Sequence, residues 1–309
     1  MQNLLSPKKR NPKRIINKLK EDWILYLLIA PCILYFILFH YFPLIGMKLA
    51  FEDYRIIGDN VFVGFKHFNT LFKSPAFFKV LKNTVIISTM KILICFPIPI
   101  VLSLLINEIR SSKYRKYVQS VVYLPHFLSW VVIAGIWISL LSTSTGAVNQ
   151  IIEAFNGTPV DYMTSKKHIR WVLVFSEMWR SAGWDSIIYL AAITKISYSL
   201  YEAAMVEGAN RWQQTIHITL PELRATIVTV FILNLGFFMN AGFDQVYNMM
   251  NDSVISVVDI LDTYVYRVGL ANGQYAYATA ASLFKGVIGI ILISSTHMIS
   301  KKLTGKGIW

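Results

Sequence analysis

Long apolar runs separated by short polar segments dominate the pattern of hydrophobic positions along the chain. Six runs have about 20 or more mostly apolar residues, which is the length a helix needs to cross the hydrocarbon core of a bilayer, and they lie near 23–44, 83–106, 117–141, 169–194, 224–244 and 276–299. None shows the strict alternation of a membrane β-strand. Because a helix satisfies its own backbone N–H and C=O groups in lipid, the pattern predicts an all-α polytopic membrane protein with six transmembrane helices.

Composition supports this class of protein. The 309 residues are 55% hydrophobic and only 15% charged, which excludes an ordinary soluble domain. The two cysteines, Cys32 and Cys95, fall inside predicted spans, so we expect neither a disulfide framework nor a metal site of the Cys/His type.

The net charge of +13 comes from lysine and arginine residues that gather on one side of the six spans. An excess of basic residues marks the cytoplasmic face, so we expect both termini in the cytoplasm of a bacterial cell whose plasma membrane the chain crosses several times. The same placement favours contact with anionic lipid over nucleic acid, which is not an expected partner. The basic residues on that side are Lys8, Lys9, Arg10, Lys13, Arg14, Lys18, Lys20, Arg110, Lys113, Arg115, Lys116, Lys195, Arg211, Arg224, Lys301, Lys302 and Lys306.

Three parts of the chain follow from these spans. Residues 1–22 form a basic cytoplasmic tail, residues 23–300 the membrane domain with a cytoplasmic loop at 197–223, and residues 301–309 a second cytoplasmic tail. The first apolar run is too long for the apolar region of a signal peptide, and no small-residue cleavage site follows it, so we expect it to remain in the mature protein.

The loop at 197–223 carries the most specific motif of the chain. It contains the pattern Glu-Ala-Ala, three residues, Gly, nine residues, Ile-x-Leu-Pro, which is met by Glu202, Ala203, Ala204, Gly208, Ile218, Leu220 and Pro221. Good helix formers precede Gly208, which is suited to end a short, thin helix in a left-handed conformation. We expect Thr219 to cap the next helix and Pro221 to occupy its first turn. The alternative is an ordinary connector, which explains the polarity of the loop but not the spacing.

This pattern resembles the loop by which permease subunits of ABC importers dock onto their ATPase. Further segments are similar to permeases of carbohydrate importers related to the LplB and YteP proteins, namely Pro31 to Gly46, Val63 to Phe72, Met178 to Ile193, Asp259 to Lys285 and the end from Gly305 to Trp309. The resemblance implies a type I (MetI-like) core of five helices with one extra N-terminal helix. It also implies a second, homologous permease, two copies of a cytoplasmic ATPase that binds ATP and Mg²⁺, and an extracytoplasmic solute-binding lipoprotein, with no cofactor on this chain.

Polar residues inside the predicted spans are candidates for a translocation path. Charged groups in a bilayer face protein or water and often mark such a path, and sugars suit a surface that mixes aromatic and hydrogen-bonding groups. The candidates are Glu177, Trp179, Arg180, Trp184, Asp185, Asn234, Asn240, Asp244 and Lys285. The alternative is structural: Glu177 and Arg180, three residues apart on one helical face, can form a buried pair that fastens helices. The sugar-binding residues belong either to this chain or to its partner permease.

No enzymatic motif is present. Gly305-Lys306-Gly307 lacks the upstream glycine and the Ser/Thr of a phosphate-binding loop, and the histidines have no nucleophile or metal-ligand spacing. We therefore expect a non-catalytic subunit of an ATP-driven importer of a sugar, with an oligosaccharide favoured. The alternative is an ion-coupled secondary transporter or channel with Glu177, Arg180, Asp185 and Lys285 as its relay, although the chain lacks the internal repeat that such proteins often show.

Overall fold

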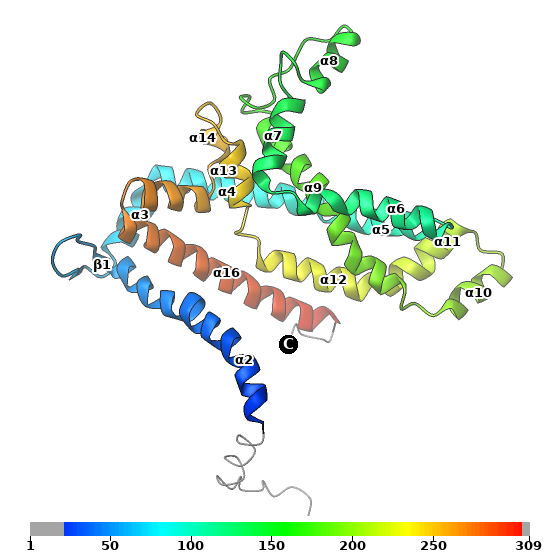
Figure 1. The fold of residues 1–309 in the computed structure, drawn as a ribbon, viewed down its shortest axis with the longest axis horizontal. Coiled ribbons are helices and arrows are strands. Elements are labelled where there is room, and N and C mark those ends of the chain that lie inside the picture. The colour runs from blue at the N-terminus through cyan, green and yellow to red at the C-terminus, as the bar shows by residue number, and fades with distance from the viewer. Residues whose placement is uncertain (1–21, 305–309) are drawn as a thin grey trace, which may run out of the picture.

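The protein is built of helices, as the pattern of apolar runs predicts (Figure 1). The computed structural model describes residues 22–304; most of the two predicted tails, 1–22 and 301–309, lies outside the described residues. Within that range the strands are limited to β1 (Glu52–Asp53) and β2 (Val61–Phe62), which pair antiparallel with Glu52 opposite Phe62. They form a hairpin at one end of the molecule.

Four helical stretches within the described residues are long and apolar enough to cross a membrane. Each consists of elements that continue one another without a break in the helical path. The stretches are Trp23–Phe51, made of α2 (Trp23–Phe36), η1 (Ile37–Tyr41) and η2 (Phe42–Phe51); Pro75–Asn107, made of α4 (Pro75–Cys95) and α5 (Pro97–Asn107); Arg211–Gly236, made of α11 (Arg211–Gln214), η4 (Thr215–Thr219) and α12 (Leu220–Gly236); and Tyr275–Met298 of α16 (Tyr275–Thr304).

The bounds of these stretches differ from the predicted spans. The second begins at Pro75, with the side chain of Ser74 accepting a hydrogen bond from Phe77 N–H, rather than near 83. The stretch predicted near 224–244 begins at Arg211 and ends at Gly236. Polar residues at helix ends are compatible with a helix that extends beyond the hydrocarbon core, so the apolar run alone marks its middle and not its ends.

The predicted span near 117–141 is not a single straight helix. It is divided into α6 (Ser112–Tyr123), a 3₁₀ turn η3 (Leu124–Phe127) and α7 (Trp130–Leu140), with a bend of 102°. Pro125 lies in the turn, and Leu128 and Ser129 are extended, so the helix stops there. Ser129 then caps α7 by accepting a hydrogen bond from Val132 N–H. The break is therefore made by Pro125 together with the extended residues Leu128 and Ser129.

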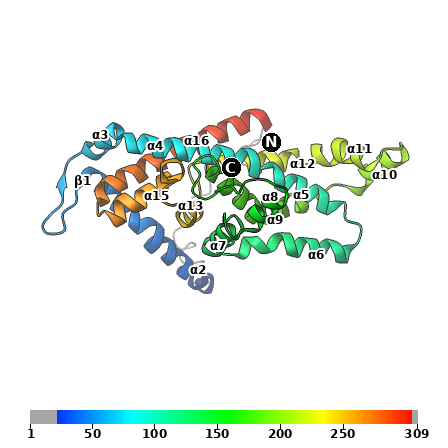
Figure 2. The same cartoon turned by 90° about the horizontal axis from the view of Figure 1, so that it is seen from above.

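The helix α9 (Ile169–Ile193) lies at the centre of the fold and packs against α4, α5, α6 and α12 (Figure 2). Its 25 residues are long enough to span a bilayer, but it carries Arg170, Glu177, Arg180 and Asp185 and is not among the four apolar stretches. Its charges are tolerated because they face other protein elements or a pocket, as described below.

The segment after α12 is packed into the core. Its elements are α13 (Phe243–Met249), α14 (Ile255–Val258), α15 (Leu261–Val265) and η5 (Tyr266–Ala271). Two hydrophobic clusters bury side chains of this segment against α4, α9 and α16, among them Val246, Met249, Val258 and Leu261. This segment between α12 and α16 is therefore a packed part of the bundle and not a loose connector.

A buried polar network joins that segment to two long helices. Asn83 of α4 donates to the carbonyls of Ser256 (3.3 Å) and Asp259 (3.2 Å), and Arg170 of α9 donates to the Asn83 side-chain oxygen (2.8 Å). The carboxylate of Asp259 pairs with Arg267. Buried polar groups must be satisfied in this way, so the network fixes α14 and α15 onto the bundle.

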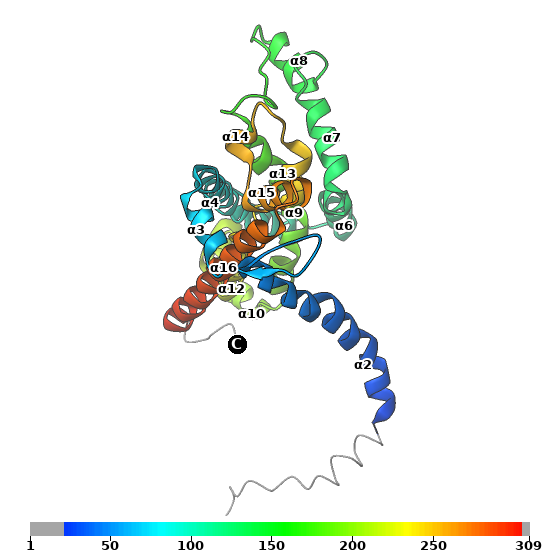
Figure 3. The same ribbon diagram turned by 90° about the vertical axis from the view of Figure 1, so that its left-hand side faces the viewer.

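Two parts of the molecule project away from the bundle in different directions (Figure 3). One is α2, whose residues are all exposed; the other is α7, which leads to α8 (Ala147–Ala154). The remaining short helices are α3 (Lys66–Lys73), which packs against α16, and α10 (Tyr198–Val206), which lies at the far end of the bundle from the β1–β2 hairpin.

Candidate functional site

The predicted docking loop forms a helical hairpin at one end of the bundle (Figure 1). Helix α10 carries Glu202, Ala203 and Ala204, a turn carries Gly208, and the returning stretch carries Ile218, Leu220 and Pro221. Tyr201 of α10 and Thr219 of the returning stretch share a hydrogen bond of 2.9 Å between their hydroxyl groups. The two arms of the hairpin are therefore held together by a contact between two residues that adjoin motif positions, Tyr201 before Glu202 and Thr219 between Ile218 and Leu220.

Gly208 ends α10 in the left-handed conformation predicted for it, with φ of +83°. The N–H of Gly208 donates to Met205 O (3.1 Å), and the N–H of Ala209 donates to Ala204 O (2.8 Å). These two bonds are those of a Schellman motif, which satisfies the last carbonyls of a helix. The predicted conformation of Gly208 is confirmed.

Pro221 lies in the first turn of α12, as predicted, but the predicted cap at Thr219 is wrong, because the helical path already begins at Arg211. Asn210 caps the returning helix instead: it accepts from Gln213 N–H (2.9 Å), and the Gln213 side chain accepts from Asn210 N–H (2.8 Å). Thr219 has helical dihedral angles and no capping bond. The π-helical turn η4 precedes Pro221, and its wider hydrogen bonds, such as Leu220 N–H to Thr215 O, let a proline without an N–H lie within a continuous helix.

The hairpin presents a groove and exposed apolar side chains. The groove, of about 410 Å³, lies between its arms and is lined in part by Ala204, Gly208 and Ile218. Val206 (89% exposed) and Trp212 (71% exposed) project beside it. A groove with exposed apolar side chains beside it suits contact with another protein.

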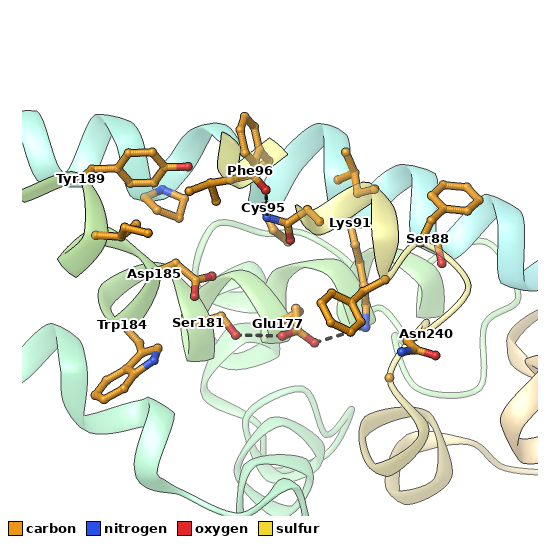
Figure 4. Close-up of a pocket in the computed structure, with 18 of the residues that line it drawn as sticks. Ser88, Lys91, Cys95, Phe96, Glu177, Ser181, Trp184, Asp185, Tyr189 and Asn240 are labelled. Carbon is orange, nitrogen blue, oxygen red and sulfur yellow. Dashed lines mark hydrogen bonds and ion pairs between the residues drawn. The ribbon is translucent and has the colours of Figure 1, made fainter. Parts of the chain in front are cut away.

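A second concave site lies within the bundle. It is a pocket of about 730 Å³ between α4, α5, α9 and α12, and the residues of the turn between α12 and α13 close one side (Figure 4). Of the candidate path residues, the pocket is lined by Glu177, Trp184, Asp185, Asn234 and Asn240. Phe96, Tyr189 and Trp130 add aromatic surface, so the lining alternates apolar rings with hydrogen-bonding groups.

The charged centre of the pocket includes a residue that sequence reasoning missed. Lys91 Nζ lies 3.2 Å from a carboxylate oxygen of Glu177, whose other oxygen accepts from the Ser181 hydroxyl at 2.8 Å (Figure 4). Lys91 is a single cation inside a long apolar run, which is a signal the sequence does contain, because an isolated charge there requires a partner. The sequence could not name that partner, since Glu177 lies far away along the chain.

The predicted pairing of Glu177 with Arg180 is wrong. The guanidinium of Arg180 donates to the His126 carbonyl oxygen (3.3 Å) and lies over the Trp130 ring, 5.0 Å from its centroid. Spacing by three residues places the two side chains on one side of α9 but does not set their directions. Lys91 on α4 takes the place expected for Arg180.

The aromatic part of the pocket is held by stacking. Trp184 lies parallel to the His126 ring, with centroids 4.6 Å apart and an interplanar angle of 3°. Phe127 meets the same indole edge to face, at 5.5 Å. The orientation of Trp184 is therefore fixed by the η3 turn, which exists because of the break in the predicted third span.

The other candidate path residues do not line the pocket. Trp179 and Asp244 have exposed side chains elsewhere on the surface, and Arg180 points to η3. Lys285 on α16 forms an ion pair of 2.5 Å with Asp262 of α15, which is a link between elements. Among the residues that the structure describes, no group of three or more His, Cys, Asp or Glu side chains is placed to hold a metal ion.

Comparisons with known proteins agree with this geometry. The family model described as "Binding-protein-dependent transport system inner membrane component" matches residues 74–305. The Polygalacturonan/rhamnogalacturonan transport system permease protein YteP of Bacillus subtilis (strain 168) is 42% identical over 306 residues, which are 98% of this chain and 95% of that protein. Protein LplB of the same organism is 40% identical over 294 residues, or 94% of this chain and 92% of that protein.

A solved structure is also similar. It is a bacterial alginate ABC transporter in complex with an alginate pentasaccharide-bound periplasmic protein, and one of its chains matches with a TM-score of 0.88 and 39% identity. The match covers 95% of this chain and 99% of that chain. The fold described above is therefore one that a chain of a known ABC transporter adopts.

Proposed function

The chain belongs to the family of binding-protein-dependent transport system inner membrane components, and we propose that it is the permease subunit of an ATP-driven importer that carries an oligosaccharide across the bacterial plasma membrane. As a member of this family it is a multi-pass membrane protein and a non-catalytic subunit. The fold is that of a MetI-like permease with an additional N-terminal helix, α2.

The observation that carries this function is the docking hairpin. Its Glu-Ala-Ala pattern lies on a thin helix whose end is fixed by Gly208, and the groove beside it is lined by residues of the same pattern. A bundle connector needs neither the groove nor exposed apolar residues such as Val206 and Trp212. These features suit the hairpin to serve as the surface that the ATPase binds.

An oligosaccharide is the cargo that the pocket favours. Sugars have apolar C–H faces and hydroxyl edges, and the pocket offers the rings of Trp184 and Tyr189 together with the amides of Asn234 and Asn240. The names of YteP and of the alginate transporter both refer to polysaccharides that contain acidic sugars. Oligosaccharides with uronate units are therefore the first to test, beside neutral ones.

The partners follow from the family and the geometry. We infer a heterodimer with a second, homologous permease, two copies of a cytoplasmic ATPase that binds ATP and Mg²⁺, and an extracytoplasmic solute-binding lipoprotein. Both termini and the docking hairpin then lie in the cytoplasm, in agreement with the excess of lysine and arginine residues in these parts of the sequence. This chain holds no cofactor of its own in that arrangement.

The proposed mechanism is alternating access. The binding protein delivers the sugar to the outer side, and closure of the ATPase pair moves the two docking hairpins. Because the returning arm of the hairpin continues into α12, which lines the pocket through Asn234, that movement reaches the pocket wall directly. The chain moves and aligns the path and performs no covalent step.

Isolation of the assembled complex tests this function. We expect an affinity-tagged chain to bring down an ATPase in a stoichiometric complex, and reconstituted vesicles to take up an oligosaccharide only with the matching binding protein and ATP. A chain that transports on its own in an ion gradient would refute the proposal.

The alternative hypothesis, an ion-coupled secondary transporter or channel, requires a relay of charged groups. The residues expected for that relay do not form one: Lys285 is paired with Asp262, and Arg180 is directed to His126. Glu177 and Asp185 remain in the pocket, but a cation from another helix holds Glu177. The geometry therefore favours the importer.

We predict that Trp184→Ala weakens uptake. The indole contributes its face to the pocket, and loss of an aromatic stacking contact of roughly 1 kcal/mol corresponds to about a five- to tenfold fall in uptake at low sugar concentration. Trp184→Phe should retain most of the uptake. Initial rates with radiolabelled oligosaccharide measure both, and Trp171→Ala, an exposed tryptophan on the same helix that does not line the pocket, is the control. Equal rates for Trp184→Ala and the control would contradict the prediction.

A further inference from the structure

One ammonium group joins three separate elements at the edge of the pocket. Lys91 Nζ of α4 lies 3.2 Å from Glu177 of α9, 2.7 Å from the carbonyl oxygen of Ala241 and 2.5 Å from the side-chain oxygen of Gln245 at the start of α13. A lysine ammonium has three N–H donors, so these acceptors use its full capacity. We refer to Lys91, Glu177, Ala241 and Gln245 as the Lys91 cluster.

The cluster holds the turn between α12 and α13, residues 237–242, against the bundle. This turn forms the wall of the pocket at the end of α12 that lies away from the docking hairpin (Figure 1). Since the hairpin is the proposed cytoplasmic end, the turn covers the pocket on the opposite, outer side. The proposal below rests on that function.

The turn is shaped for the lysine. Gly242 has φ of +95°, and a Cβ atom added to it would lie 2.9 Å from Lys91 Nζ. Gln245 is completely buried, and its amide nitrogen donates to the Leu173 carbonyl (2.6 Å) and the Ser176 hydroxyl (2.8 Å) of α9. The side-chain amide of Gln245 thus accepts from Lys91 through its oxygen and donates to α9 through its nitrogen.

We propose that Lys91 is the positioning residue that keeps the outer side of the pocket closed, and that sugar enters only when the turn at 237–242 releases from this ammonium. The charge-assisted bonds to Glu177 and to two neutral oxygens are strong in a partly buried setting. Replacing this cation removes the bond from Ala241 to α4 and the link through the ammonium to Glu177 of α9, so that only the direct bonds of Gln245 to α9 still hold this part of the chain. A two-position element of this kind is what alternating access requires.

The accessibility of Cys95 tests the proposal without any sugar. Cys95 lines the same pocket, and Cys32 is the other cysteine of the sequence. In the assembled transporter carrying Cys32→Ser, in right-side-out vesicles without ATP, we measure the rate at which a small membrane-impermeant thiol reagent labels this chain. We expect Lys91→Met to raise that rate roughly tenfold, as for the loss of a buried charge-assisted contact, and Lys91→Arg to stay much closer to the parent.

Lys82→Met is the matched control. Lys82 is exposed on the same helix and has no ion-pair partner among the described residues, so its loss should leave the labelling rate unchanged. Gly242→Ala is a second route to the same state, because the new Cβ would lie 2.9 Å from the ammonium, and it should raise the rate to a lesser degree. Alanine is also strained at the positive φ of this position, so Gly273→Ala, at a positive φ with nothing within 4 Å of the new Cβ, is its control and should leave the rate unchanged. Gly242→Ala decides the matter if Lys91→Met fails to assemble.

An equal labelling rate in Lys91→Met, or in Gly242→Ala where only that variant assembles, overturns the proposal. So does an equal rise in Lys82→Met, because the effect would then be a general loosening of α4. Failure of the importer assignment itself would appear in the isolation of the complex and in the uptake assay, which are separate measurements.

Discussion

Replacing Gly208 with valine is expected to abolish uptake while leaving the chain in the membrane. Gly208 has φ of +83°, where a β-branched residue is strained by about 1–3 kcal/mol. No atom lies within 4 Å of an added Cβ, so the effect is not a clash. The strain falls on the bonds from Gly208 and Ala209 that end α10, and the helix would end elsewhere, with the docking groove distorted. Uptake of labelled sugar and the amount of chain in the membrane measure the two effects.

A matched position separates this effect from simple strain. Gly273, between η5 and α16, also has a positive φ, +71°, with nothing within 4 Å of an added Cβ. Gly273→Val therefore carries similar strain away from the docking hairpin and should retain most of the uptake. Gly208→Asn should recover part of it, because asparagine tolerates the left-handed region. Normal uptake by Gly208→Val would contradict the role given to the hairpin.

Substituting Gly183 with alanine is expected to prevent the chain from folding stably, so that little of it accumulates in the membrane. Gly183 on α9 faces α6 so closely that an added Cβ would lie 1.9 Å from the carbonyl oxygen of Val122 and 2.5 Å from its carbonyl carbon. Both are backbone atoms, so the two helices must move apart, at a cost of about 3 kcal/mol or more. The separation would also disturb Trp184 and Asp185, the next residues along α9. The amount of chain in the membrane and its thermal stability in detergent measure the loss.

Gly289→Ala is the control for that substitution. Gly289 lies in α16, and nothing lies within 4 Å of an added Cβ. Alanine is favoured over glycine inside a helix by about 1 kcal/mol, so this variant should be as stable as the parent or slightly more. Equal stability of the Gly183 and Gly289 variants would show that α6 and α9 are not in close backbone contact at Gly183.

The docking hairpin could be predicted from the sequence because its information is local. The helix formers, the glycine and the proline stand within 20 residues, and the left-handed conformation of Gly208 follows from the absence of a side chain there. The error at Thr219 has a local cause as well. A π-helical turn is not recognised from residue types, so Thr219 and Pro221 suggest the start of a helix where the structure continues one.

The pocket could be predicted only in part. The polar residues of α9 were visible in the sequence as charges within an apolar run, and Glu177, Trp184 and Asp185 do line the pocket. Their partners were not visible, because Lys91 reaches Glu177 across 86 positions of the chain. Contacts of that range are decided by how the helices cross, and no periodicity within either helix specifies the crossing.

The bend in the third span could also be predicted only in part. The run at 117–141 contains Pro125, and an apolar run on both sides of a proline is compatible with a kinked span or with two helices. Only the extended residues Leu128 and Ser129, followed by the Ser129 cap, make it a bend of 102°. The bend places His126 and Phe127 against Trp184, so a local break contributes to the distant pocket.

The unbroken path of the helix through Pro221 connects the docking hairpin rigidly to the pocket wall at Asn234. Arg211–Gly236 is a single rod of 26 residues, which at 1.5 Å per residue is about 39 Å long. If nucleotide-driven closure tilts such a helix by about 10° about its near end, its far end moves by about 7 Å. Because the π-helical turn η4 accommodates Pro221 without breaking the helix, no flexible joint separates the hairpin from the pocket wall, and a movement at one end is carried to the other.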